Sequence, residues 1–173
     1  MENGQFQIYT GNGKGKTTAA IGLAIRAAGA GLKVYIGQFI KDMEYSEVKI
    51  LQGVPGITIE QYGTGKGCLI GRAPSREDID CASQGLDKAV KIMVSGKYDV
   101  VIMDEINVAC SLKLLTENQL KAAAEKRPSE VELVFTGRYA PDSVLNMADL
   151  VTEMKEVKHY YTKGLLARTG IER

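Results

Sequence analysis

Residues 10–20 read TGNGKGKTTAA, a glycine-rich turn that runs directly into an alanine-rich helical pattern. The preceding residues 5–9, QFQIY, predict a β-strand, so the turn joins a strand to a helix. Glycines allow successive backbone N–H groups to curl around an anion, and a helix start adds unpaired donors and partial positive charge. The sequence therefore predicts a phosphate-binding loop of the P-loop type at residues 11–17, rather than a turn that only links two elements.

The residues of this loop have distinct expected roles. The Lys16 ammonium is expected to reach phosphate oxygens, and the Thr17 hydroxyl to contact a bound Mg²⁺. The usual spacing, G-x-x-x-x-G-K-S/T, puts glycine where this chain has Thr10. Counted from Gly11 the loop is one residue shorter, so it is expected to hold a triphosphate differently from an ordinary ATPase. The predicted nucleotide contacts in the loop are Gly11, Asn12, Gly13, Lys14, Gly15, Lys16, Thr17 and Thr18.

Short β-branched or aromatic runs alternate with helical segments along the chain. They predict strands at residues 5–9, 33–39, 57–61, 99–103, 130–136 and 150–153. The apolar run VVIM at 100–103 has no polar alternation, as expected of a central strand covered on both faces. The pattern predicts an α/β fold of the P-loop NTPase (RecA-like) class, a mostly parallel sheet of about six strands with helices on both faces. No repeat or linker divides residues 1–173, so a single domain is expected.

Helices and one long loop are predicted between these strands. The first helix, residues 16–28, is apolar nearly all round and is expected to be deeply buried. Ser75 with Asp78, and Thr116 with Gln119, have the capping-box spacing and predict helices that run to about residues 94 and 126. Residues 62–74, YGTGKGCLIGRAP, have no clear period and predict a long loop of the kind that is often functional.

Charged residues follow three of the predicted strands, at the edge where open α/β sheets bind ligands. Asp104 and Glu105 end the fourth strand, and one of them is expected to hold Mg²⁺ directly or through water. In an ATPase the second carboxylate would activate water instead, and two solvated carboxylates are the simplest alternative. Arg138 follows the fifth strand and Lys41 the second, each as a candidate contact to phosphate or ribose or as part of a structural ion pair.

Composition narrows the function classes. The chain has 22 Lys plus Arg and 21 Asp plus Glu, so no overall field attracts nucleic acid or an anionic membrane. A single histidine, His159, excludes a multi-histidine metal site and disfavours a histidine-based hydrolase. The cysteines, Cys68, Cys81 and Cys110, lack metal-ligand spacing and are expected as free thiols. Because neither a signal peptide nor a membrane span is predicted, a cytoplasmic protein is expected.

Further motifs occur together with the loop. They are RAAGAGLKV after the first helix, GQFIK at 37–41, VVIMDE at 100–105, TGR at 136–138 and, near the end, ADLVTEM, EVKHYY and GLLARTGIE. With them the chain resembles the P-loop family of ATP:corrinoid adenosyltransferases, also called cob(I)alamin adenosyltransferases, which act in vitamin B12 biosynthesis and salvage. The resemblance spans almost the whole chain and is weak between about residues 43 and 99.

The resemblance implies that the Co(I) centre of a corrinoid, cobalamin or a precursor, attacks the ribose 5′ carbon of ATP and expels triphosphate. Family members are described as binding ATP turned end for end relative to ordinary P-loop enzymes. Co(I) is already a strong nucleophile, so the protein's task is positioning and charge neutralisation without a general base. Carried over by motif, Lys16 and Glu105 are the catalytic candidates, Thr17 and Glu105 the Mg²⁺ ligands, and Asp104 their near neighbour.

The resemblance also implies a homodimer and a reductase that supplies the electron for Co(I). In relatives, aromatic side chains after the third strand help displace the lower axial cobalt ligand. The corresponding residues here are Lys66, Gly67, Cys68, Leu69 and Ile70. Leu69 and Ile70 are expected either to fill that role by bulk or to anchor the loop, with Cys68 as a cobalt ligand a further alternative. Two other functions stay open: a P-loop ATPase or small-molecule kinase, and a nucleotide-gated corrinoid-binding module.

Overall fold

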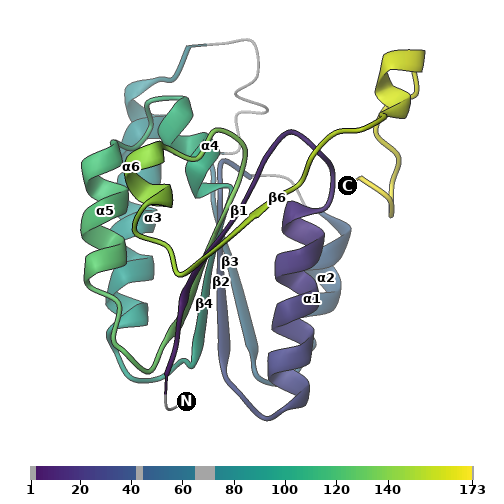
Figure 1. Ribbon diagram of the computed structural model, residues 1–173. Helices are drawn as coiled ribbons and strands as arrows, with labels where there is room; N and C mark the ends of the chain where they lie inside the picture. The colour runs from purple at the N-terminus through teal and green to yellow at the C-terminus, as the bar shows by residue number, and fades with distance from the viewer. Residues whose placement is uncertain (1–2, 42–44, 65–72, 173) are drawn as a thin grey trace.

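The computed structural model describes residues 3–41, 45–64 and 73–172. In these residues six strands form a parallel sheet in the order β3-β2-β4-β5-β1-β6 (Figure 1). The strands are β1 (Phe6–Thr10), β2 (Val34–Phe39), β3 (Ile57–Tyr62), β4 (Val100–Asp104), β5 (Glu132–Thr136) and β6 (Leu150–Glu153). The predicted α/β class and strands are confirmed, and β4 lies inside the sheet, as its unbroken apolar run predicts.

Helices cover both faces of this sheet (Figure 1). On one face lie α1 (Lys16–Gly29) and α2 (Ser46–Leu51), and on the other α3 (Arg76–Met93), α4 (Ile106–Ser111), α5 (Glu117–Glu125) and α6 (Asp142–Leu145). After β6 the chain forms a 3₁₀ turn, η1 (Tyr160–Lys163). The side chains of β2 are all buried and alternate between two cores, with Tyr35 and Phe39 in the core of α3, and Val34 and Ile36 in the core of α1.

The helices α3 and α5 begin at the predicted capping boxes. Ser75 Oγ accepts from Asp78 N–H, and Thr116 Oγ1 accepts from Gln119 N–H, each at 3.3 Å with the reciprocal bond also present. The helices end at Met93 and Glu125, within one residue of the predicted ends. The short helices α2, α4 and α6 have 4 to 6 residues, too few to show a helical period in the sequence.

The prediction that α1 is deeply buried is wrong. Its buried residues are Lys16, Ala20, Ala24 and Ala27, which recur every three or four positions. The opposite face is open, and Ile25 there is 45% exposed. The helix lies on the outside of the sheet, so it buries one stripe, and apolar composition without that geometry overstates burial.

Gly85 of α3 lies against the ring of Tyr62. A Cβ on Gly85 would come within 2.5 Å of Tyr62 Cγ, so we expect Gly85→Ala to destabilise the fold by about 1–3 kcal/mol through overpacking. Gly22 of α1 is the matched control, because a Cβ there meets nothing within 4 Å. Gly22→Ala is expected to stabilise by about 0.5–1 kcal/mol through helix propensity. Urea unfolding measures both changes, and the same sign for both would contradict this packing.

Candidate active site

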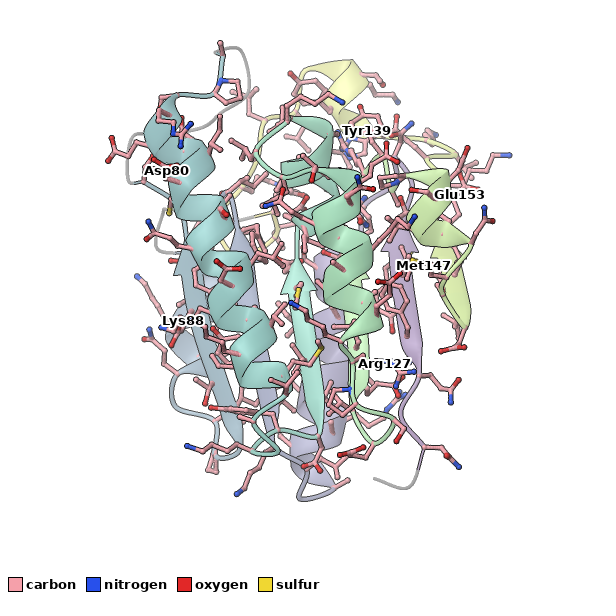
Figure 2. The ribbon with its side chains drawn as sticks, turned by 90° about the vertical axis from the view of Figure 1, so that its left-hand side faces the viewer. Asp80, Lys88, Arg127, Tyr139, Met147 and Glu153 are labelled. Carbon is pink, nitrogen blue, oxygen red and sulfur yellow. The ribbon has the colours of Figure 1, made fainter. Side chains whose placement is uncertain are left out.

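The candidate residues gather where β1, β2, β4 and β5 end. Three non-glycine residues at this edge have a left-handed backbone: Ile40 (φ 55°), Glu105 (φ 61°) and Tyr139 (φ 61°). Figure 2 labels Tyr139, which lies in the turn after β5, and Glu153, which ends β6; both lie toward the upper end of the molecule in that view. Such a backbone costs about 1–3 kcal/mol and collects at ligand sites. Ile40 precedes Lys41, Tyr139 follows Arg138, and Glu105 is itself a candidate residue. No sequence pattern indicates this left-handed backbone.

Lys16 closes the phosphate loop from inside. Its Nζ donates to the carbonyl oxygens of Gly11 at 2.8 Å and Gly13 at 2.7 Å, and the residue is 7% exposed. Burial lowers the pKa of the ammonium, and the charge of Glu105 opposes this. Gly15 precedes α1 with φ 121°, and no side chain in the described residues caps the helix start. The first N–H groups of α1 therefore lie uncapped beside a buried ammonium, an arrangement that binds phosphate.

The first half of the loop packs on the chain that follows β6. Gly13 N–H donates to the Met154 carbonyl at 2.6 Å, and Met154 N–H donates to the Thr10 carbonyl at 2.8 Å. A Cβ on Gly11 or Gly13 would lie 2.6 Å from that Met154 oxygen. Close backbone packing therefore requires both glycines. Met154 is far from Gly11 and Gly13 in the sequence, so no local pattern indicates this contact. The sequence indicates only phosphate binding for these two glycines.

Asp104 is buried at the end of β4, with 1% of its surface exposed. Its Oδ1 accepts from Thr17 Oγ1 at 2.9 Å and from Thr136 Oγ1 at 2.6 Å. Its Oδ2 accepts from Lys41 Nζ at 2.8 Å and from Gln38 Nε2 at 3.2 Å. Burial alone would raise the pKa of this carboxyl, but the Lys41 charge and the hydrogen bonds hold it below its usual value. The carboxylate therefore stays ionised beside Thr17 of the phosphate loop.

Glu105 comes directly after Asp104 and precedes α4. Its N–H donates to Thr136 Oγ1 at 2.9 Å. Burial, followed by the charge of Asp104, raises the pKa of the Glu105 carboxyl, while Lys41 and Lys16 act in the opposite direction. A bound cation would favour the ionised form, so Glu105 is a suitable cation ligand.

Glu105→Gln is expected to stabilise the ligand-free protein modestly at neutral pH. Because the folded-state pKa of Glu105 is raised, its ionised form opposes folding above that pKa, and glutamine removes this effect. The gain shrinks as pH falls through the raised pKa and vanishes below the unfolded value of about 4.3. Urea unfolding at pH 7 and pH 4 checks the prediction, with the exposed Glu156→Gln as control. If Glu105→Gln made the protein less stable at pH 7, that result by itself would contradict the prediction.

The basic candidates Lys41 and Arg138 lie in different surroundings. The Lys41 side chain is 12% exposed, pairs with Asp104 and with Glu47 Oε1 at 3.5 Å, and its Nζ lies 5.0 Å from the Tyr45 ring centroid. Burial alone would lower the pKa of Lys41, but Asp104 raises it. Arg138 is exposed in the turn after β5. Lys41 therefore has the structural ion pair that the sequence left as one alternative.

The remaining predicted residues are placed as follows. Asn12, Lys14 and Thr18 are exposed on the loop and first helical turn. Cys110 is buried, Cys81 is partly buried, and both are free thiols, as predicted. His159 Nδ1 accepts from Tyr161 N–H at 3.1 Å at the start of η1. The residues predicted beside the corrinoid lie outside the described part of the chain: Lys66, Gly67, Cys68, Leu69 and Ile70.

The donor set at Thr17 and Asp104 fits Mg²⁺. The Thr17 hydroxyl and an Asp104 oxygen are hard oxygen atoms 2.9 Å apart, and Mg²⁺ is commonly held by one or two protein ligands together with substrate phosphates and water. Across residues 3–41, 45–64 and 73–172, no group of three or more His, Cys, Asp or Glu is arranged to hold a metal ion. No helix in those same ranges is long and apolar enough to cross a bilayer.

A strand, a glycine-rich loop with a buried lysine, a helix and a neighbouring carboxylate define a P-loop nucleotide-binding protein. The model of the family described as ATP:corrinoid adenosyltransferase BtuR/CobO/CobP matches residues 2–173. The chain is 33% identical to the corrinoid adenosyltransferase of Escherichia coli K12, over 99% of this chain and 86% of that protein. For the corrinoid adenosyltransferase of Pseudomonas aeruginosa the values are 32%, 99% and 84%. An uncharacterized protein of Nostoc sp. is 36% identical over 98% of this chain, which spans 48% of its length.

The chain therefore belongs to the ATP:corrinoid adenosyltransferase family. The resemblance indicated by its motifs is confirmed, and the match covers nearly the whole chain, including the weak middle segment. The protein is a transferase that uses ATP and acts on a corrinoid.

Proposed function

We propose that this protein transfers the 5′-adenosyl group of ATP to the Co(I) centre of a corrinoid, cobalamin or a precursor, and releases triphosphate. The phosphate loop carries the proposal, since Lys16 Nζ is buried beside the uncapped start of α1. Asp104 accepts from Thr17, Thr136 and Lys41, so it is engaged in holding charge rather than in taking a proton from an attacking oxygen. This arrangement suits a reaction whose nucleophile needs no base.

In the proposed reaction the electron pair of Co(I) forms a bond to C5′ while the C5′–O bond breaks. The electrons of that bond leave with the triphosphate oxygen, and cobalt becomes formally Co(III). Because no proton moves, the protein contributes orientation and stabilisation of the leaving polyanion. Lys16 and the first N–H groups of α1 lie at the loop that would receive that charge.

Mg²⁺, when bound, would neutralise part of the charge on the departing triphosphate. Thr17 and Glu105 are the proposed ligands, and Asp104, which accepts from Thr17, is a third candidate. The Gly11 to Thr18 backbone, Lys14, Lys41 and Arg138 are proposed to contact the nucleotide. Lys41 would have to share its ammonium between Asp104 and the nucleotide.

The setting of the enzyme is also a proposal. We propose that residues 1–173 act as one domain of a homodimer in the cytoplasm, with a reductase that supplies the electron for Co(I). Exposed apolar side chains after β6 support an interface: Val157 is 87%, Leu166 72% and Tyr161 65% exposed. The free thiols of Cys81 and Cys110 support a reducing compartment.

The test is a reaction of the protein with ATP, Mg²⁺ and chemically reduced cobalamin. We expect the absorption spectrum of adenosylcobalamin to develop and phosphorus NMR to show triphosphate in equal amount. ADP without a cobalt–carbon bond would indicate a P-loop ATPase or a small-molecule kinase. Saturable corrinoid binding without any adenosylcobalamin would indicate a nucleotide-gated binding module.

A further inference from the structure

The chain that follows β6 returns to the phosphate loop. We call residues 154–172 the C-terminal segment; Figure 1 shows it leaving β6 beside the connection from β1 to α1. Its first residue, Met154, accepts from Gly13 N–H at 2.6 Å. Its last residue, Glu172, contacts Lys14 of the same loop at 2.9 Å. The C-terminal segment therefore contacts the phosphate loop through both its first and its last residue.

Glu172 is the centre of a small charged cluster. Its carboxylate accepts from Arg168 N–H at 2.8 Å and from Arg168 Nη2 at 3.1 Å, and also from the Tyr160 hydroxyl. Hydrogen bonds from Arg168, Tyr160 and Lys14 lower the pKa of Glu172 well below its usual value. The Glu172 side chain is only 16% exposed, although it lies near the end of the chain. The Glu172 carboxylate is thus a fixed negative charge beside the phosphate loop.

Lys14 is the partner of this anion. Its Nζ donates to Glu172 Oε1 at 2.9 Å and to the Tyr160 hydroxyl at 3.1 Å, and the side chain is 42% exposed. The hydrogen bonds that Lys14 donates to Glu172 and Tyr160 raise its pKa, so it stays charged. Lys14 lies between Gly13 and Gly15 of the loop. An ammonium in that position is within the charge field of any bound polyphosphate, yet here its partner is a carboxylate.

We infer that Glu172 competes with the polyphosphate for Lys14, holding this lysine while the loop is free and reclaiming it as the triphosphate product leaves. The inference rests on the proposed function, because it requires polyphosphate to bind at the Gly11 to Thr18 loop. Product release matters for an enzyme whose product is a polyanion bound by several positive groups. A competing carboxylate weakens that hold without touching the reacting carbon.

The inference is tested by titrating the wild-type protein with inorganic tripolyphosphate in the presence of Mg²⁺ at low salt, using calorimetry. Glu172→Gln is expected to bind tripolyphosphate about two- to fivefold more tightly, the range for releasing a partly exposed ion pair. The gain should shrink at high salt, where exposed charges are screened. Tyr160→Phe, which removes one donor to Glu172 and one acceptor of Lys14, should shift the affinity in the same direction by less.

A second background separates this mechanism from general charge repulsion. In Lys14→Met, adding Glu172→Gln should leave tripolyphosphate affinity unchanged, because the contested ammonium is gone. Glu156→Gln, the same chemical change at an exposed position of the C-terminal segment, is the control and should have little effect. An equal gain in the Lys14→Met background, or unchanged or weaker binding by Glu172→Gln, would overturn the inference. If wild-type protein binds tripolyphosphate but forms no adenosylcobalamin, the proposed reaction fails and this cycle still decides the role of Glu172.

Discussion

Lys16→Ala is expected to lower kcat for adenosyl transfer by about 10²–10³-fold, the usual loss when one preorganised charge-stabilising donor is removed. The Lys16 ammonium is buried at the loop and faces the carbonyls of Gly11 and Gly13. In the proposed reaction it is the cation closest to the loop backbone as charge develops on the triphosphate. Its removal should leave the fold intact, because the Lys16 side chain bonds two carbonyl oxygens of the loop and is not part of either apolar core.

Steady-state formation of adenosylcobalamin measures this effect, and circular dichroism checks that the variant is folded. Lys97→Ala, an exposed lysine in the turn before β4, is the matched control and should keep wild-type activity. Turnover close to wild type in Lys16→Ala would contradict the assignment of the phosphate site.

Asp104→Asn is expected to destabilise the protein by about 3–5 kcal/mol, the range for removing one member of a buried ion pair. Lys41 Nζ lies 2.8 Å from Asp104 Oδ2, and its side chain is only 12% exposed. Asparagine leaves that ammonium with only the more distant Glu47 carboxylate, at 3.5 Å, and can place an N–H₂ group against it. Activity should also fall by at least about 10²-fold, since the same carboxylate accepts from the Thr17 hydroxyl.

Urea unfolding and product formation measure the two effects of Asp104→Asn separately. The double variant Asp104→Asn with Lys41→Met should recover much of the stability, because no buried charge is left unpaired, and none of the activity. The folded-state pKa of Asp104 is lowered, so its contribution to stability is present above the unfolded pKa of about 3.9 and is lost as pH falls through the lower value. An Asp104→Asn protein as stable as wild type at pH 7 would show that the ion pair contributes little.

The sheet and the phosphate loop could be predicted because their signals are local. The strand, the glycines, Lys16 and the helix follow one another within residues 5–29, and the capping boxes at Ser75 and Thr116 span four residues each. The burial of α1 could not be predicted in the same way, because it depends on packing that is not local in the sequence. Which face of a helix meets the sheet depends on packing, and the apolar residues of α1 do not by themselves define a single stripe.

The contacts that complete the site could not be predicted because their partners are distant along the chain. Met154 bonds with Gly13, Glu172 with Lys14, and Lys41 with Asp104. In each pair the two residues are far apart in the sequence. No spacing rule connects such pairs. No sequence pattern predicts the left-handed backbone of Ile40 either, since a β-branched residue normally avoids positive φ. Local chemistry therefore predicts where a site lies, and long-range packing determines how its charges are held.

A crystal structure with ATP and Mg²⁺ bound would show directly which end of the nucleotide the phosphate loop holds. We expect the terminal phosphates to lie against the start of α1, within hydrogen-bonding distance of Lys16 Nζ, and the ribose 5′ carbon to be turned outward to where a corrinoid can approach. A loop that remains empty at saturating ATP, or a nucleotide whose γ-phosphate rather than its 5′ carbon faces the open side, would contradict this expectation.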